Sequence, residues 1–149
     1  MILEQRTWID TDPSAVFRFF ESMAEHYEDW HPDHIRFRWG QGGELKEGGE
    51  AYFEERIGGE LQEKTVVFTA IEPDRYLEFR PTDWTRLLLP SISFSIDPDD
   101  GGCTVVQRIK VRTGPIGRFL NRREFEAVRT HMREEGEHLK RLLEDELAP

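Results

Sequence analysis

The sequence predicts an α+β fold in which a curved antiparallel sheet of six to seven strands packs under one long C-terminal helix. The middle of the chain is a series of strand-like segments joined by turns of hairpin length, and such connections favour antiparallel pairing. The closing stretch, 121–147, repeats apolar residues at about the 3.6-residue period of a helix. These residues are Phe125, Val128, Met132, Leu139, Leu142, Leu143 and Leu147. We expect a hydrophobic cavity between the helix and the sheet.

Length and composition predict one globular domain that spans residues 1–149. Hydrophobic residues make up 37% and charged residues 34% of the chain, which is typical of a soluble, folded protein. No apolar run approaches the roughly 20 residues of a membrane helix, so we expect no integral membrane association. The acidic N-terminus has no apolar signal core, and Cys103 is the single cysteine. Both observations favour a cytoplasmic location.

The formal net charge of −10 argues against nucleic acid as a partner, because the field of the protein would repel phosphates. It argues equally against an anionic membrane surface. Arg108, Lys110 and Arg112 alternate along one predicted strand and would share a face. We interpret that face as a solvated outer surface paired with acidic residues.

The N-terminal part predicts a strand followed by two short helices. Residues 2–11 form the strand, Asp12 suits an N-cap, and Pro13 suits the first helical position. An apolar stripe from Ala15 to Met23 defines the first helix. The second helix runs from Met23 to Asp29 or Trp30, because a proline follows at position 32 and disfavours helix in the residue before it.

The remaining strands are predicted from apolar alternation and from the turns between them. Gly58-Gly59 is a tight turn, and two more turns follow at 72–75 and 97–102. Pro90 marks a bulge or an edge, and Gly114-Pro115 ends the last strand before the final helix. The predicted strands are 35–39, 51–57, 60–72, 76–80, 86–96 and 103–113.

The order and spacing of several short motifs run along essentially the whole chain. They are Thr11-Asp12-Pro13-Ser14-Ala15-Val16-Phe17, then Trp30 and Pro32, then Ile71-Glu72-Pro73-Asp74-Arg75 before Tyr76-Leu77-Glu78-Phe79, and Gly114-Pro115-Ile116-Gly117. In these motifs the chain resembles the START-like, or SRPBCC, superfamily with its helix-grip fold, and within it the polyketide cyclase/dehydrase-like proteins. The resemblance implies a curved sheet that grips the last helix around a hydrophobic cavity. It implies no single activity and supplies no catalytic motif.

Two groups of histidines and carboxylates are candidates for chemistry. The segment His26–His34 holds three histidines and several carboxylates, which could bind a metal or move protons, but its spacing matches no known zinc motif. In the alternative, Trp30 fills the core and the histidines cap the helix or lie at the cavity mouth. His131, Glu135 and His138 share a face of the final helix and could form a metal-binding face. Because this face lies beside the apolar stripe, we interpret it as solvated. We therefore predict no metal ligand and no cofactor.

Strand alternation places two polar side chains on inward faces. Glu55 lies on the same face as Phe53, and Gln107 lies with Val105 and Ile109. Buried polar groups need partners, which a ligand could supply, and desolvation would make Glu55 a general base. In the alternative, Glu55 pairs with an arginine such as Arg80.

Aromatic and other residues complete the predicted cavity. Trp84 follows Pro81-Thr82-Asp83 in a loop and is predicted to form a lid, with Asp83 as a secondary acid or base. Gly136 interrupts the inward stripe of the helix, either to leave room for a ligand or to contact the sheet closely. The predicted ligand-binding residues are Trp30, Trp39, Phe53, Phe68, Phe79, Trp84, Phe94, Gln107, Met132 and Gly136.

Three functions are compatible with this sequence. The first is binding or transport of a small hydrophobic molecule, such as a lipid, a polyketide or an aromatic compound. The second is a cofactor-independent cyclase or dehydratase that uses Glu55 with His31 or His34 as acid and base. The third is a protein-interaction module whose cavity is too small to matter. The first is the prediction that we adopt, and the second is its alternative.

Overall fold

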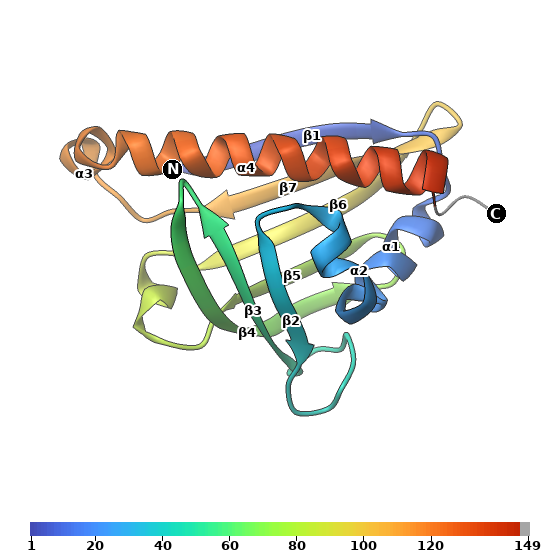
Figure 1. The fold of residues 1–149 in the computed structure, drawn as a ribbon, viewed down its shortest axis with the longest axis horizontal. Coiled ribbons are helices and arrows are strands. Elements are labelled where there is room, and N and C mark those ends of the chain that lie inside the picture. The colour runs from blue at the N-terminus through green and yellow to red at the C-terminus, as the bar shows by residue number, and fades with distance from the viewer. Residues whose placement is uncertain (147–149) are drawn as a thin grey trace.

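The computed structural model describes residues 1–146 and contains a curved sheet of seven strands with a long helix lying across it (Figure 1). The predicted helix-grip fold is confirmed. The strands are β1 Ile2–Ile9, β2 His34–Trp39, β3 Glu50–Ile57, β4 Glu60–Glu72, β5 Tyr76–Pro81, β6 Ser91–Asp99 and β7 Gly102–Lys110. The helices are α1 Pro13–Glu21, α2 Met23–Trp30, the 3₁₀ turn η1 Trp84–Leu87, α3 Pro115–Leu120, α4 Arg122–Arg141 and the π-helical turn η2 Leu142–Glu146.

The sheet is antiparallel throughout, with the strand order β1-β7-β6-β5-β4-β3-β2. Strands β2 to β7 pair as successive neighbours, whereas β1 pairs with the last strand, and α1 and α2 connect it to the opposite edge. Two-residue turns fit the twist of the sheet because their residues adopt positive φ. Gly58 and Gly59 have φ of 61° and 83° between β3 and β4, and Asp100 and Gly101 have φ of 50° and 82° between β6 and β7.

Helix α4 packs on β1 and also contacts β3 and α2, so it lies over the inner face of the sheet (Figure 1). The main apolar core lies where α1 and α2 meet the sheet and the C-terminal part of α4. Phe20 packs against Trp30 and Phe94, with ring centroids 6.0 Å and 4.6 Å away. Within residues 1–146, no helix is long and apolar enough to cross a membrane.

The predicted start of β6 was wrong. Residues 86–89 were predicted as strand, but Arg86 belongs to η1, and β6 starts only after Pro90, at Ser91. The side chain of Asp83 accepts a hydrogen bond from the Thr85 backbone N–H at 2.9 Å and so stabilises η1. An N-terminal cap of this kind favours a helical turn over a strand.

The ends of the last elements also differ from prediction. Strand β7 stops at Lys110 rather than at residue 113, and the turn before it is shorter because β6 runs on to Asp99. The final helical region divides into α3 and α4 at Asn121 and ends in the turn η2. Leu147, the last residue of the predicted apolar stripe, lies outside the described residues.

Candidate functional site

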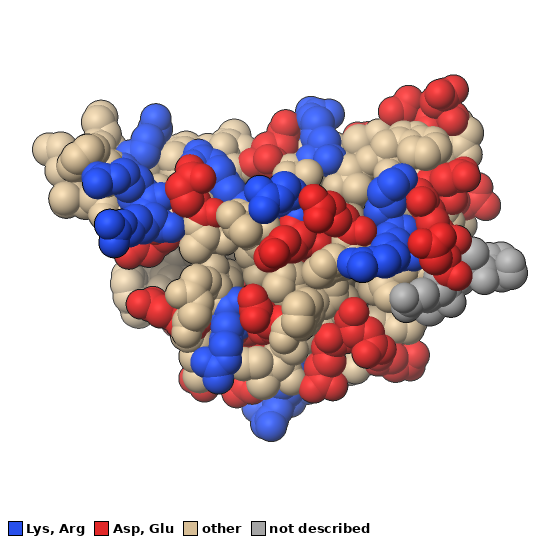
Figure 2. Space-filling model, turned by 45° about the horizontal axis from the view of Figure 1, so that its top comes forward, with Lys and Arg blue, Asp and Glu red and all other residues tan. Residues whose placement is uncertain are grey.

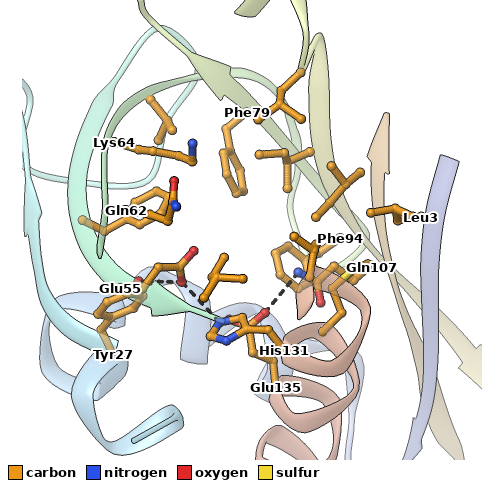
Figure 3. A pocket seen from close by; sticks show the side chains of 18 of the residues that line it. Leu3, Tyr27, Glu55, Gln62, Lys64, Phe79, Phe94, Gln107, His131 and Glu135 are labelled. Carbon is orange, nitrogen blue, oxygen red and sulfur yellow. Dashed lines mark hydrogen bonds and ion pairs between the residues drawn. The ribbon is translucent and has the colours of Figure 1, made fainter. Parts of the chain in front are cut away.

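A cavity of about 480 Å³ lies between the sheet and α4 (Figure 3). Most of its lining is apolar, and eight predicted ligand-binding residues line it: Trp30, Trp39, Phe53, Phe68, Phe79, Phe94, Gln107 and Met132. At the start of α4, exposed Arg123 and Glu124 also line it, so the cavity reaches the surface there. The face in Figure 2 is hollowed toward the end of the molecule that carries α3.

Two predicted ligand-binding residues do not line this cavity. Trp84 is 65% exposed on η1, so the structure does not place it as a lid. Gly136 faces β1, where an added Cβ would clash with the hydroxyl of Thr7. The glycine therefore allows close contact between helix and sheet, and it does not provide room for a ligand.

Polar side chains from four elements gather at one part of the cavity wall (Figure 3). They come from α2, β3, β7 and α4, and they are Tyr27, Glu55, Gln107, His131 and Glu135. Alternation along β3 and β7 turns Glu55 and Gln107 inward, as predicted from the sequence. The other three were not among the predicted site residues.

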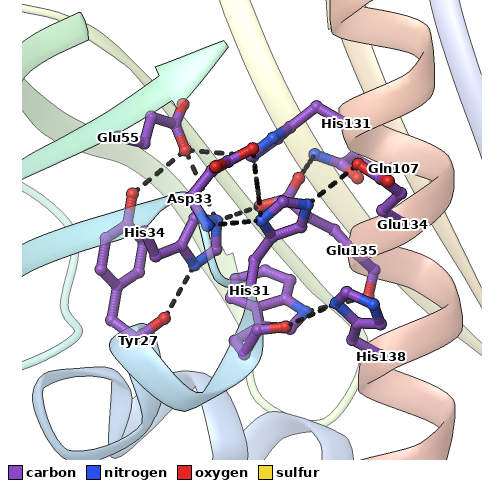
Figure 4. Close-up of polar contacts among 11 residues, drawn as sticks. Tyr27, His31, Asp33, His34, Glu55, Gln107, His131, Glu134, Glu135 and His138 are labelled. Carbon is purple, nitrogen blue, oxygen red and sulfur yellow. Dashed lines mark hydrogen bonds and ion pairs between the residues drawn. The ribbon is translucent and has the colours of Figure 1, made fainter. Parts of the chain in front are cut away.

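Four side-chain atoms converge behind this wall (Figure 4). The Nε2 atom of His34 lies 2.9 Å from Glu135 Oε2 and 3.5 Å from Glu55 Oε2. The Nε2 atom of His131 lies 3.3 Å from the same Glu55 oxygen and 3.4 Å from the same Glu135 oxygen. We call these four residues the His–Glu cluster. All four residues are buried; Glu55, His131 and Glu135 line the cavity, whereas His34 does not.

Neighbouring groups hold the cluster in position (Figure 4). The Tyr27 hydroxyl donates to Glu55 Oε2 at 3.1 Å, and Gln107 Nε2 donates to Glu135 Oε1 at 3.3 Å. His34 Nδ1 lies 2.8 Å from the Tyr27 backbone oxygen. Because a carbonyl oxygen only accepts hydrogen bonds, His34 Nδ1 carries a proton and donates it there.

The electrostatics of the cluster are strongly perturbed. Burial opposes a positive charge on His131, but the adjacent Glu135 and Glu55 carboxylates outweigh it and raise the pKa of His131 to about 10. Burial likewise opposes ionisation of Glu135, but its two histidine neighbours hold the pKa of that carboxyl well below its usual range. Burial, together with the charges of Glu55 and Glu135, raises the pKa of Tyr27 far above that of a free tyrosine.

His31, a predicted catalytic residue, lies beside the cluster and outside the cavity lining. Its Nδ1 atom accepts the Asp33 backbone N–H at 2.9 Å, and its Nε2 atom lies 3.1 Å from Glu134 Oε1. The ring centroids of His31 and His131 are 4.3 Å apart. Burial lowers the pKa of His31.

The predicted solvated face of α4 is wrong for His131 and Glu135, which are both buried. Helix α4 packs on β1 and also contacts β3 and α2, so this face of the helix is covered rather than open to solvent. His138, on the same face, contacts the Trp30 backbone oxygen at 3.0 Å through Nδ1. Glu55 contacts Tyr27 and the two histidines of the cluster in place of the alternative partner Arg80.

A curved antiparallel sheet that grips a long helix around an apolar cavity defines the helix-grip class of ligand-binding folds. The family model described as "Polyketide cyclase / dehydrase and lipid transport" matches residues 2–144. The chain belongs to this family, which confirms the resemblance drawn from its motifs.

Solved structures agree on the fold at low sequence identity. TTHA0849 from Thermus thermophilus is 13% identical, with a TM-score of 0.72 and 94% of each chain covered. Ara h 8.0201 is 14% identical, with a TM-score of 0.65, and the match covers 94% of this chain and 95% of that one. The di-domain ARO/CYC BexL from the BE-7585A biosynthetic pathway is 16% identical, with a TM-score of 0.72, and matches 100% of this chain and 51% of its own. No curated protein matches this sequence.

Proposed function

We propose that this protein binds a small, mostly apolar molecule with one polar group in the cavity between the sheet and α4. The observation that carries the proposal is a cavity of about 480 Å³ with mostly apolar walls and a buried polar region formed by Tyr27, Glu55, Gln107, His131 and Glu135. Gln62 and Lys64 of β4 add two partly exposed polar side chains to the lining (Figure 3). Binding sites for small molecules typically measure about 300–1,000 Å³ and combine apolar walls with a few polar groups that fix orientation. An engineered cavity of about 150 Å³ already holds benzene, so this cavity has room for a larger molecule.

The lining suggests how such a molecule would lie. Its apolar body would pack against Phe53, Phe79 and Phe94, and each buried CH₂ group would contribute about 0.8 kcal/mol. Its hydroxyl or carbonyl group would face Glu55 and His131, the two ionisable side chains that meet at the polar part of the lining. Lipids, polyketides and aromatic compounds all fit this description, and the family description names the first two of these classes.

Acid/base catalysis of a cyclisation or dehydration is the second candidate function. It is favoured because two ionisable groups, Glu55 and His131, both line the cavity and lie 3.3 Å apart. Glu55 would remove a proton next to a substrate carbonyl, and protonated His131 would donate one to the departing hydroxyl. In this role His131 replaces His31 and His34, since neither of them lines the cavity.

Native mass spectrometry of freshly purified protein, followed by solvent extraction, tests the binding function. We expect one organic molecule per protein chain. Its chemical class would indicate which substrates to use in turnover assays. The fluorescent probe ANS provides a second readout in the stripped protein. Failure to find either an extracted molecule or saturable ANS binding would contradict the proposal.

A matched pair of variants on α4 locates the binding site. Val128 lines the cavity, whereas the next residue, Arg129, is exposed. Val128→Trp would fill part of the cavity and weaken ANS binding at least about tenfold, which corresponds to roughly 1.4 kcal/mol. Arg129→Trp adds the same side chain to the surface and should leave ANS binding unchanged. Equal effects of the two variants would place the probe outside the cavity.

A further inference from the structure

We propose that His34, Glu55, His131 and Glu135 form a binding site for one divalent transition-metal ion, of which Zn²⁺ is the best-fitting example. The site would lie at the polar wall of the cavity. This inference goes beyond ligand binding and differs from the absence of a metal expected from the sequence.

The spacing of the four atoms is the first argument. Zinc binds nitrogen and oxygen ligands at about 2.0–2.2 Å in a tetrahedron, so neighbouring ligand atoms lie about 3.3–3.6 Å apart. The four histidine-to-carboxylate distances in the cluster range from 2.9 to 3.5 Å. All four atoms lie within 4.8 Å of one another. One ion can therefore reach all four with little movement of the side chains.

The surroundings of the cluster are the second argument. A metal-bound histidine usually donates its other ring N–H to a carbonyl or a carboxylate, which orients the ring and fixes its tautomer. His34 does so through Nδ1 to the Tyr27 backbone oxygen at 2.8 Å. Gln107 orients Glu135 through its other oxygen, Oε1, and leaves Oε2 for the metal. The Tyr27 hydroxyl donates to Glu55 Oε2 itself, and a carboxylate oxygen has two lone pairs, so it can accept this hydrogen bond and bind a metal as well. These contacts leave His34 Nε2 and both Oε2 atoms facing one point (Figure 4).

The third argument is an unsatisfied atom. His131 is only 6% exposed, and its Nε2 has no hydrogen-bond partner within the part of the chain that the structure describes. It nevertheless lies 3.3 Å from Glu55 Oε2 and 3.4 Å from Glu135 Oε2. Buried ring nitrogens are normally paired, so one that points at two carboxylates calls for an explanation. A metal ion would supply the missing partner.

Charge balance is the fourth argument. Two carboxylates that are removed from water carry a large desolvation penalty unless positive charge compensates them. Without a metal, protonated His131 supplies part of that charge. A divalent cation held by two neutral imidazoles supplies all of it and neutralises Glu55 and Glu135 together. Imidazole and carboxylate ligands suit zinc and its first-row neighbours better than magnesium or calcium. The four groups come from β2, β3 and α4. Only the i, i+4 pair His131 and Glu135 has a local sequence signal, and no motif could have joined it to His34 and Glu55.

Calorimetric titration of Zn²⁺ into chelator-treated, desalted protein tests the site. We expect one Zn²⁺ ion per chain and, with Co²⁺ as a substitute, the visible absorption of a tetrahedral complex. Glu135→Gln should weaken Zn²⁺ binding by at least about 100-fold, because loss of a mere supporting group already costs 10- to 100-fold. The neighbouring change Glu134→Gln is the control: this carboxylate contacts His31, and its loss should leave Zn²⁺ affinity unchanged.

Other outcomes would overturn the proposal. His31, Asp33 and His131 form a second group of possible ligand atoms. If Asp33→Asn abolishes Zn²⁺ binding while Glu135→Gln does not, the metal lies at that group. Absence of stoichiometric binding to the folded wild-type protein excludes both sites. Circular dichroism checks that each variant folds, and Glu55→Gln, whose side chain borders the cavity, replaces Glu135→Gln if the latter unfolds.

The metal-binding proposal and the cavity-binding proposal can be tested separately. Val128→Trp should lose ANS binding and keep its Zn²⁺ ion. His34→Gln changes the cluster residue that does not line the cavity, so this variant should lose Zn²⁺ and still bind ANS. Stoichiometric Zn²⁺ on the four cluster residues would exclude the cofactor-independent form of the acid/base candidate, because the metal would occupy the lone pairs that this mechanism uses.

Discussion

At the scale of single residues, Gly136 shows how tightly α4 and the sheet approach each other. A Cβ at this position would clash with the hydroxyl of Thr7 on β1. Glycine in a helix costs about 1 kcal/mol relative to alanine. Its presence here lowers helix propensity but allows the close contact between α4 and β1. The contact sets the height of α4 over β1, beside the Glu135 and Met132 positions that line the cavity.

Gly136→Ala should therefore destabilise the protein, although alanine is the better helix former. Overpacking at a tight contact typically costs about 1–3 kcal/mol, and we expect a loss of this size in the free energy of unfolding measured with urea. Thr7→Ala removes the clashing hydroxyl. The double variant should recover most of the loss, and additive effects of the two changes would contradict this explanation.

At the scale of elements, α4 serves both the core and the site. Its C-terminal part places Leu139 in the main core, and its middle places His131 and Glu135 in the cluster. This is possible because the helix is covered on more than one side, by β1 below and by β3 and α2 along its flank. The site therefore depends on a helix whose position is set by packing some distance away.

Leu139→Ala tests how strongly this packing holds α4. Leu139 is 1% exposed, and truncation of a buried leucine to alanine typically costs about 2–5 kcal/mol. We expect a loss in this range by urea denaturation. Arg133→Ala, on the exposed side of the same helix, should change the free energy of unfolding by less than about 0.5 kcal/mol. Similar losses of unfolding free energy for both variants would mean that α4 stabilises the protein through helix propensity and not through the packing of Leu139.

At the scale of the whole molecule, one helix, α4, contributes both to the packed core and to the lining of the cavity. Aromatic side chains of α1 and α2 fill the space below the C-terminal part of α4. Near its N-terminal part, exposed Arg123 and Glu124 line the cavity, which reaches the surface there. Acidic and basic side chains are interspersed over the face in Figure 2, and on the sheet Arg108 pairs with Glu4 at 2.8 Å.

The net charge of −10 predicts a salt-dependent stability. Acidic groups in excess repel one another in the compact state, and salt at about 0.1 M screens charges more than roughly 10 Å apart. The melting temperature should therefore rise when NaCl is added at pH 7 to a low-salt, chelator-containing buffer. KCl should act equally, and sucrose at matched osmolarity controls for solvent exclusion. A melting temperature that falls with NaCl would show that local ion pairs outweigh the repulsion.

The fold could be predicted from sequence because its signals are local. Alternation in β3 and β7 turned Glu55 and Gln107 inward, and glycine turns marked the hairpins. Asp12 and Pro13 marked the start of α1. Each of these signals acts within a few residues, through backbone conformation or through the side on which a side chain emerges.

The candidate site depended on contacts between distant segments. The sequence by itself determined the helix-grip fold and an apolar container, and its helical period placed His131 and Glu135 on one face of α4. Only the tertiary structure decided that this face is buried, because β3 and α2 cover it, and that it meets His34 and Glu55. The physical reason is that periodicity reports which residues share a face, whereas burial depends on what the rest of the chain packs against that face.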